Sequence, residues 1–358
     1  MRKLASVQKI WKTEPIEGAD RIELVHVLGW QVVAKKGEFK EGDYCVYFEI
    51  DSFLPIDPRF EFLRSSSYKN SELLGEGFRL KTQKLRGEIS QGLVMPCSDF
   101  PELWYDPIEK MNSVVPTEGQ DVTRLLGVRK WEIPEMATTG GTVIGELPSD
   151  VPHTDETRIQ ANPGLLEEFS GLEYYISTKM DGSSHSISID ENGFHVTGHN
   201  YEYKDDDTSG FYRLVKKRDY KDKVTAWMVS HPEVKTITLQ GEYCGPGVQK
   251  NPLKLQSPEW YVFTIRINGK RVGLDEMESI LAALGPSFKM VPIEEKAFDL
   301  PSKYPTVDAL LERAVGNYES GNRKEGIVIR PVEPVWSKSI KAELSMKVIN
   351  NKYLLKND

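Results

Sequence analysis

A stretch rich in glycine, proline and threonine divides this chain and limits its fold more than any other feature. It runs over residues 131–153, shows little periodic hydrophobicity, and contains Pro134, Thr138, Thr139, Gly140, Gly141, Gly145, Pro148 and Pro152. Such a composition is typical of a linker. With 358 residues, 39% of them hydrophobic, the chain is long enough for two cores. We therefore predict one domain over 1–130, a linker over 131–153 and a second domain over 154–358.

The first 100 residues have the pattern of short strands separated by turns. Polarity alternates over 21–28, strand-like runs follow at 31–34 and 43–50, and glycines separate them. This pattern predicts a small antiparallel barrel. Another alternating run, 78–86, carries Arg79, Lys81, Lys84 and Arg86. A barrel with such a basic strand would follow a phosphate backbone in the manner of an oligonucleotide-binding (OB) fold. The alternative is that these cations form a solvated strand face.

The second domain mixes strand and helix patterns. Strand-like runs occur at 174–178, 184–189, 236–239, 260–267 and 326–330. Between them, residues 277–284 and 307–318 place apolar side chains at three- and four-residue spacing, which predicts helices. We expect an α+β domain built as a sandwich of antiparallel sheets.

Composition excludes several classes of protein. A formal charge of −8 argues against a strongly basic nucleic-acid binder, although a local basic groove remains compatible with it. Three scattered cysteines make no disulfide framework, and six dispersed histidines show no zinc-binding spacing. The sequence has neither a secretory signal nor about 18 consecutive apolar residues. We expect a soluble, cytoplasmic protein with no membrane association.

Four elements in a fixed order suggest covalent group transfer. Lys179 opens Lys179-Met180-Asp181-Gly182, and Glu242, Glu325 and Lys347 follow. Covalent nucleotidyl transfer needs an amine nucleophile, carboxylates that hold a metal, and a second cation that faces the charge developing on phosphorus. A free lysine is protonated at neutral pH, so the pKa of Lys179 must be lowered by a cation or by burial. Lys-x-Asp-Gly alone is weak evidence, because it is also an ordinary strand-to-turn sequence.

These residues lie in segments that resemble a known superfamily. Residues 179–182, 241–243, 262–264, 325–330 and 346–349 resemble motifs I, III, IIIa, IV and V of the covalent nucleotidyltransferases, which include RNA ligases, DNA ligases and capping enzymes. Segments 87–92, 154–160 and 245–251 are similar to the Deinococcus-type RNA ligases, which carry an N-terminal OB module. The resemblance implies an OB-like barrel followed by an antiparallel-sheet nucleotidyltransferase (ATP-grasp-like ligase) domain. DNA ligases and capping enzymes of this superfamily have an OB domain after motif V, but only 11 residues follow Lys347 here. We therefore expect the N-terminal barrel to be the OB domain that assists catalysis.

The resemblance also implies a reaction and its residues. Lys179 would attack the α-phosphate of ATP and hold AMP, which would pass to a 5′-phosphate on RNA before a 3′-hydroxyl displaces it. The partner would be RNA or an RNA-containing duplex, with no protein partner evident. Catalysis would rest on Lys179 and Lys347. Mg²⁺ or Mn²⁺ would be held, largely through water, by Asp181, Glu242 and Glu325. The implied nucleotide-binding residues are Arg158, Thr178, Asp181, Gly182, Asn200, Glu242, Phe263, Glu325 and Lys347.

Simpler interpretations exist for some of these residues. Phe263 lies in an alternating apolar strand and would also suit a core, and Arg158 would also suit a local salt bridge. Lone carboxylates such as Glu242 and Glu325 are usually surface residues.

Three positions depart from the family pattern. His199 stands where many relatives have arginine, Ile349 where many have a second lysine, and Thr178 where glutamate is frequent. The loss of that arginine predicts strong self-adenylylation with slow sealing. Two other functions remain open: a nucleotidyltransferase with a different acceptor, of the capping or protein-modifying type, and a catalytically weakened nucleic-acid-binding module.

Overall fold

The chain forms two compact units. The computed structural model describes residues 2–106, 111–112, 114–132, 140–168 and 170–357. Among them, the first unit takes residues 2–132, 159–163 and 354–357, and the second unit takes 140–158 and 164–353. None of the described helices has both the length and the apolar character that crossing a membrane requires. The three cysteines are free thiols.

The first unit is built on a curled sheet of antiparallel strands. Within its described residues the order is β10, β4, β1, β2, β3, and the bounds are β1 (Ala5–Pro15), β2 (Ile22–Val27), β3 (Trp30–Lys35), β4 (Tyr44–Phe48) and β10 (Leu93–Pro96). β1 pairs with β4 through its first half and with β2 through its second, and the register shifts between Ile10 and Lys12. A bulge of this kind bends a strand and increases its twist. One long strand therefore serves both halves of the curled sheet.

Smaller sheets complete the first unit. The described strands β13 (Arg129–Lys130), β5 (Ser52–Leu54), β7 (Gly75–Arg79) and β6 (Tyr68–Ser71) form one sheet in that order. Two hairpins pair β8 (Thr82–Leu85) with β9 (Glu88–Gln91) and β11 (Tyr105–Asp106) with β12 (Met111–Asn112). The short helix α1 (Arg64–Ser67) precedes β6. The core includes Val46, Phe48, Phe60, Phe78 and Phe100.

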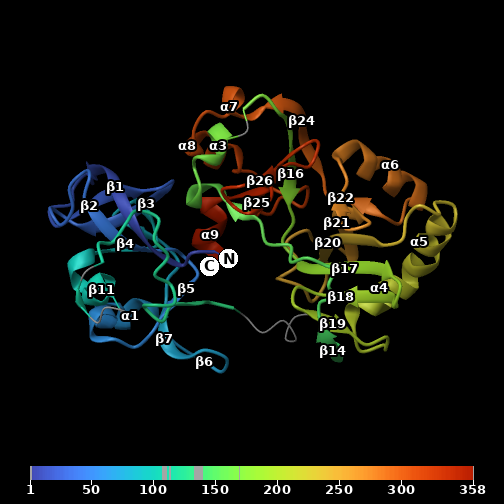
Figure 1. Cartoon of the computed structure of the whole chain (residues 1–358), viewed down its shortest axis with the longest axis horizontal. Coiled ribbons are helices and arrows are strands. Elements are labelled where there is room, and N and C mark those ends of the chain that lie inside the picture. The colour runs from blue at the N-terminus through green and yellow to red at the C-terminus, as the bar shows by residue number, and fades with distance from the viewer. Residues whose placement is uncertain (1, 107–110, 113, 133–139, 169, 358) are drawn as a thin grey trace. The chain divides into compact units, whose positions relative to one another are not determined.

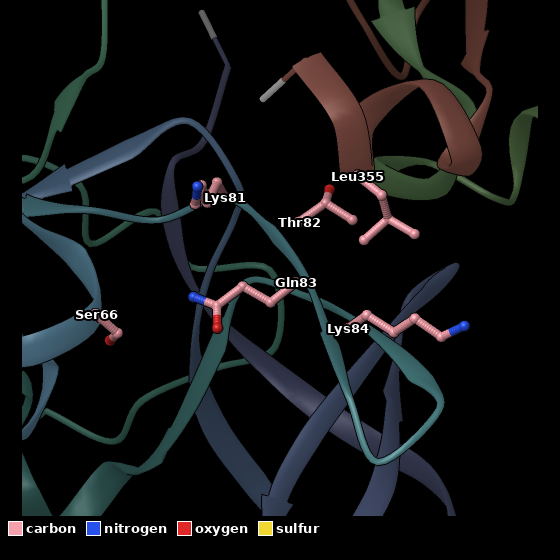
Figure 2. Close-up of a pocket in the computed structure, with 6 residues that line it drawn as sticks. All are labelled: Ser66, Lys81, Thr82, Gln83, Lys84 and Leu355. Atoms are coloured by element: carbon pink, nitrogen blue, oxygen red, sulfur yellow. The ribbon is translucent and has the colours of Figure 1, made fainter. Parts of the chain in front are cut away.

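The predicted basic strand 78–86 is two strands, and its cations have different surroundings. β7 ends at Arg79 and β8 begins at Thr82. The Arg79 guanidinium lies over the Trp131 ring, 5.1 Å from its centroid, so this cation packs within the unit. Lys81 and Lys84 instead line a hollow (Figure 2), together with Ser66, Thr82, Gln83 and Leu355.

The larger sheet of the second unit is covered on one face by helices. Within the described residues its order is β14 (Val143–Glu146), β19 (Tyr201–Tyr203), β18 (Gly193–Thr197), β17 (Ser183–Asp190), β20 (Ile237–Cys244), β21 (Glu259–Ile267) and β22 (Lys270–Arg271), with β23 (Lys289–Met290) parallel to β21. Helices α4 (Gly210–Arg218), α5 (Tyr220–Val229) and α6 (Leu274–Leu284) flank it (Figure 1). Their apolar faces pack on Ile187, Leu239 and Trp260, so the helix side of this sheet is a hydrophobic core.

The second sheet of this unit contains strands from the start of the domain, β15 (Thr157–Arg158) and β16 (Glu173–Lys179), and from its end, β25 (Gly326–Pro331) and β28 (Met346–Ile349). Its described strands are ordered β15, β28, β25, β16 and β24 (Ile293–Asp299). All pairs are antiparallel except β15 with β28. The remaining elements are α3 (Leu165–Glu168), α7 (Leu300–Lys303), α8 (Val307–Arg313), β26 (Trp336–Ser337), β27 (Ala342–Glu343) and α9 (Asn351–Asn357).

Two predicted boundaries differ from the structure. The helix predicted over 307–318 ends at the cap residue Ala314, because the Tyr318 amide bonds to the Asn322 carbonyl in a turn. The segment predicted as linker, 131–153, contains β14, which pairs with β19. Its start is also structured, since the Trp131 amide donates to the Asp51 carbonyl. Residues 133–139 lie outside the described part of the chain.

Candidate active site

The turn after β16 brings the two sheets of the second unit together. Lys179 is the last residue of β16, and residues 180–182 lead directly into β17 of the larger sheet. The Gly182 amide donates to Glu242 Oε1 at 3.1 Å. A Cβ at Gly182 would lie 2.4 Å from the Tyr243 carbonyl oxygen and 2.8 Å from Cys244 Sγ. Only glycine allows this close approach, which places Lys179 beside Glu242.

Lys179 pairs with a carboxylate from the adjacent strand. Its Nζ lies 3.1 Å from Glu325 Oε2, and both side chains are 19% exposed. Lys179 faces Gly326 across the β16/β25 pair, so Glu325 is next to the partner residue. The Tyr318 hydroxyl donates to the Lys179 carbonyl at 2.9 Å and accepts from the Glu325 amide at 3.1 Å. This tyrosine fixes the backbones of the two residues relative to each other.

The pKa of Lys179 is raised, contrary to the expectation that it is lowered. Burial lowers the pKa of this amine, but the negative charges of Glu325, Glu242 and Glu156 outweigh burial. The lysine is therefore protonated at neutral pH in the absence of a nucleotide and a metal. Its activation requires that positive charge offset these carboxylates.

Two carboxyl groups near Lys179, those of Glu242 and Asp181, have raised pKa values. Burial, reinforced by the charges of Glu325 and Asp181, raises the pKa of Glu242 to about 8. Burial and the charge of Glu325 raise the pKa of Asp181 to about 6, although the Tyr353 hydroxyl donates to Asp181 Oδ2 at 2.7 Å. Crowded oxygen donors of this kind suit a hard divalent cation, which relieves their mutual repulsion. Among the described residues, no three His, Cys, Asp or Glu side chains are arranged to ligate a metal directly.

A second cation lies on the same sheet face as Lys179. Lys347 in β28 is the partner of Val328 and, across the parallel pair, of Arg158. Side chains of paired residues share a sheet face, and so do alternate residues along a strand. Burial, together with the charges of Lys179 and Arg158, lowers the pKa of Lys347 to about 8. Lys179, Lys347 and Arg158 therefore share this face, where their charges suit an anionic ligand.

A small apolar cluster lies next to the motif I turn. Met180, Cys244 and Val291 form a small buried cluster, against which Leu253, Leu255, Tyr261, Phe263 and Met290 pack. Phe263 is half-buried, with its ring partly accessible. Such a surface suits the flat face of a nucleobase.

Arg330 links Phe263, which packs on the small apolar cluster, to Glu156 in the segment before motif I. Its side chain is buried and donates to the Phe263 carbonyl at 2.5 Å, to Thr264 Oγ1 at 3.0 Å, to Ser345 Oγ at 2.9 Å and to Glu156 Oε1 at 2.9 Å. Its guanidinium also lies 5.5 Å from the Phe263 ring centroid. Arg330 therefore holds the aromatic ring and Glu156 in place.

Thr178 does not join the cluster through its side chain. Adjacent strand residues point to opposite faces, and the Thr178 hydroxyl donates to Glu294 Oε1 at 2.8 Å. Its amide donates to the Pro292 carbonyl. The hydroxyl of Thr178 therefore serves the opposite face, and nucleotide binding at this position stays a prediction.

The predicted residue Asn200 and the two departures His199 and Ile349 lie in different sheets of the second unit. Asn200 occupies the turn between β18 and β19 beside His199, whose Nε2 lies 3.5 Å from Asp155 Oδ2. Ile349 is buried and pairs with Gly326, on the same face as Lys347. An apolar side chain thus fills the place where many relatives carry a lysine.

Sequence reasoning missed the residues that support the cluster. Tyr318, Tyr353, Glu156 and Arg330 contact or orient the motif residues, and Arg330 was noticed only as the end of motif IV. No local pattern marks them, because their partners lie 7 to 174 positions away in the chain.

Comparisons with known proteins agree with this geometry. A family model described as RNA ligase matches residues 172–349, and one described as an OB-fold domain matches residues 4–97. An apo variant of Naegleria gruberi RNA ligase is 32% identical, with a TM-score of 0.85 over 99% of this chain and 98% of that one. Variants of the same protein with AMP and manganese and with ATP and manganese are also 32% identical, with TM-scores of 0.87 and 0.86 over 99% of both chains. No curated protein sequence gave a match.

The fold and the site together define a ligase with an N-terminal OB-fold module and an antiparallel-sheet catalytic domain. The predicted α+β fold class is thereby confirmed. The chain belongs to the RNA ligase family and is an RNA-joining enzyme.

Replacement of Gly182 by alanine tests the close approach at motif I. We expect Gly182→Ala to lower the rate of self-adenylylation by about 10- to 100-fold, because displacement of reacting groups by about 1 Å costs that much. Gly145→Ala is the matched control, since a Cβ there meets nothing within 4 Å. Single-turnover labelling with α-labelled ATP measures the rate, and equal rates for the two variants would contradict the geometry.

The pH dependence of adenylylation tests Lys347. A rate that depends on attack by the unprotonated Lys179 amine is expected to rise with pH. Lys347 loses its charge near pH 8, since its pKa is lowered to about 8, and we expect the wild-type profile to level off there. Arginine keeps its charge at higher pH, so the profile of Lys347→Arg should continue to rise. A profile that levels off at the same pH in both proteins would rule out this role.

Proposed function

We propose that this RNA ligase uses ATP to seal 3′-hydroxyl and 5′-phosphate ends, at nicks in duplexes, through a lysyl-AMP intermediate on Lys179. One observation carries the proposal. The Lys179 amine lies 3.1 Å from Glu325, in a cluster that also contains Asp181 and Glu242, with Lys347 on the same sheet face. These are the parts that covalent nucleotidyl transfer needs.

The first step follows from these positions. Nζ of Lys179 loses a proton and attacks the α-phosphorus of ATP, so that a nitrogen–phosphorus bond forms and the bond to pyrophosphate breaks. Lys347 and Arg158 face the phosphates and stabilise the charge that develops on their oxygens. The half-buried ring of Phe263 stacks on the adenine beside the small apolar cluster.

Similar solved structures and the residues of this site both support the use of ATP and a divalent metal. The Naegleria gruberi relatives were solved with ATP and manganese and with AMP and manganese. In this chain, Asp181, Glu242 and Glu325 would hold Mg²⁺ or Mn²⁺ largely through its waters. When bound, the cation supplies positive charge that offsets these carboxylates and removes the cause of the raised pKa of Lys179.

Transfer to RNA completes the reaction. AMP passes from Lys179 to the 5′-phosphate of RNA, and the 3′-hydroxyl then attacks that phosphate and releases AMP. A module that follows the backbone of an A-form duplex by shape supports sealing at nicks. The N-terminal OB module and the segments 87–92, 154–160 and 245–251 support membership of the Deinococcus-type branch.

Labelling separates this function from its alternatives. Incubation with α-labelled ATP, or GTP, and magnesium should give an acid-labile label on the wild type with ATP alone. In Lys179→Ala the label should fall by more than about 100-fold, because the nucleophile is absent. Lys270→Ala, an exposed lysine in the same unit, is the control and should label normally.

The acceptor is identified in a second stage. Labelled enzyme is mixed with nicked duplexes that carry RNA or DNA on the 3′-hydroxyl side, and with single strands. We expect sealing of RNA-sided nicks, at a slower rate than adenylylation because His199 replaces the usual arginine. Label without sealing on any nucleic acid would overturn the ligase proposal in favour of another acceptor.

We also propose that the hollow beside β8 contacts the RNA backbone. Lys81 and Lys84 provide two cations there, and Ser66, Thr82 and Gln83 provide polar groups that suit phosphate oxygens. This favours the phosphate-tracking interpretation for two of the four basic residues, whereas Arg79 packs on Trp131.

The double variant Lys81→Ala/Lys84→Ala tests this contact. We expect unchanged adenylylation, sealing reduced by about 10-fold at physiological salt, and a salt dependence of RNA binding that is shallower by about one to two ion equivalents. Lys12→Ala is the control, because Lys12 is already paired with Glu14 at 2.8 Å. An unchanged salt slope would exclude direct phosphate contact.

A further inference from the structure

Glu294 collects polar contacts from three separate segments. It is one of the first residues of β24, and its side chain is 18% exposed. Its two oxygens accept from Lys324 Nζ at 2.6 and 2.8 Å, and they also accept from Arg313 Nη1 at 2.7 Å and from Thr178 Oγ1 at 2.8 Å. Burial raises the pKa of Glu294, but these hydrogen bonds outweigh burial and the net pKa is lowered. The group is therefore a carboxylate at neutral pH.

Two of its three partners are immediate neighbours of site residues. Thr178 precedes Lys179, and Lys324 precedes Glu325. Because adjacent strand residues point to opposite faces, Glu294 contacts the end of β16 from the face away from Lys179 Nζ. One carboxylate thus joins the residue before the nucleophile to the residue before its paired carboxylate.

The backbones of Thr178 and Lys324 are also fixed by hydrogen bonds. The Thr178 amide donates to the Pro292 carbonyl, two residues before Glu294. The Lys324 amide donates to the Gly316 carbonyl, and Asn350 Nδ2 donates to the Lys324 carbonyl at 3.2 Å. Lys324 is 5% exposed, so its ammonium depends on Glu294 for a countercharge. A shift of Glu294 would therefore be transmitted to both site residues.

We propose that Glu294 is a positioning residue that sets the distance between Lys179 and Glu325 for adenylyl transfer. It acts through Thr178 and Lys324 without contacting the nucleotide. This inference rests on the proposed role of Lys179 as the nucleophile. A mainly structural role, in which Glu294 ties Arg313 of α8 to the sheet, is the rival explanation.

Thr178→Val is the sharpest test, because it removes the link to β16 and leaves the ion pairs of Glu294 with Lys324 and Arg313 in place. We expect the maximal single-turnover rate of adenylylation to fall by about 5- to 20-fold, with little change in the ATP concentration at half-maximal rate. Thr178→Ser keeps the hydroxyl and should restore the rate to within about 2-fold of the wild type, since the same hydrogen bond can form.

Two further variants keep the test independent of stability. Thr238→Val removes a buried threonine hydroxyl from the larger sheet, and its rate of adenylylation should stay that of the wild type whatever the change in Tm. Glu294→Gln, if it folds, should lower the rate by more than Thr178→Val, because both links weaken together.

The outcomes distinguish this inference from the proposed function. A wild type that never acquires Lys179-dependent label overturns the proposed function itself. A wild type that labels, with Thr178→Val labelling at the same maximal rate, overturns the positioning role alone. An equal loss in Thr178→Ser and Thr178→Val, or a loss confined to Tm, would assign Glu294 to the structural role.

Discussion

The partly buried ion pair between Lys179 and Glu325 is the interaction on which the site depends. The charges of Glu325, Glu242 and Glu156 stabilise the Lys179 amine as a cation, so it is protonated in the absence of a nucleotide and a metal. Burial and the charge of Glu325 raise the pKa of Glu242 and of Asp181, and a bound divalent cation would offset this repulsion. One charge cluster thus keeps this amine protonated and also suits a divalent cation.

The five-stranded sheet of the second unit carries the site residues on one face and the contacts that support them on the other. One face carries four cations, Lys179, Lys347, Arg158 and Arg330. The motif carboxylates and the small apolar cluster lie near this face. Thr178 faces the other side, where Glu294 ties it to Lys324 and Arg313. Alternation along a strand makes this division possible. Residues next to each other in sequence therefore have different tasks.

Much of the fold and of the site was predictable from local pattern. The alternation in the first 100 residues indicated the curled sheet, and the runs around Lys179, Glu242 and Glu325 became β16, β20 and β25. Prediction was wrong where a local signal conflicted with a tertiary contact. Glycines at 140, 141 and 145 suggested a linker, yet β14 forms because β19 offers a free strand edge. The helical spacing over 307–318 continued past Arg313, yet Tyr318 is held in a turn that reaches Lys179 and Glu325.

The sequence by itself determined which chemical groups this protein has and their order along the chain: the motif lysine, the carboxylates that follow it and the late cation. These properties belong to the covalent structure and do not depend on how the chain packs. Only the tertiary structure decided the charge states and the supporting contacts, because pKa values and hydrogen bonds depend on distances and burial between segments far apart in the chain. The raised pKa of Lys179, the turn of Thr178 away from the site and the convergence of three segments on Glu294 are therefore visible only in the folded protein.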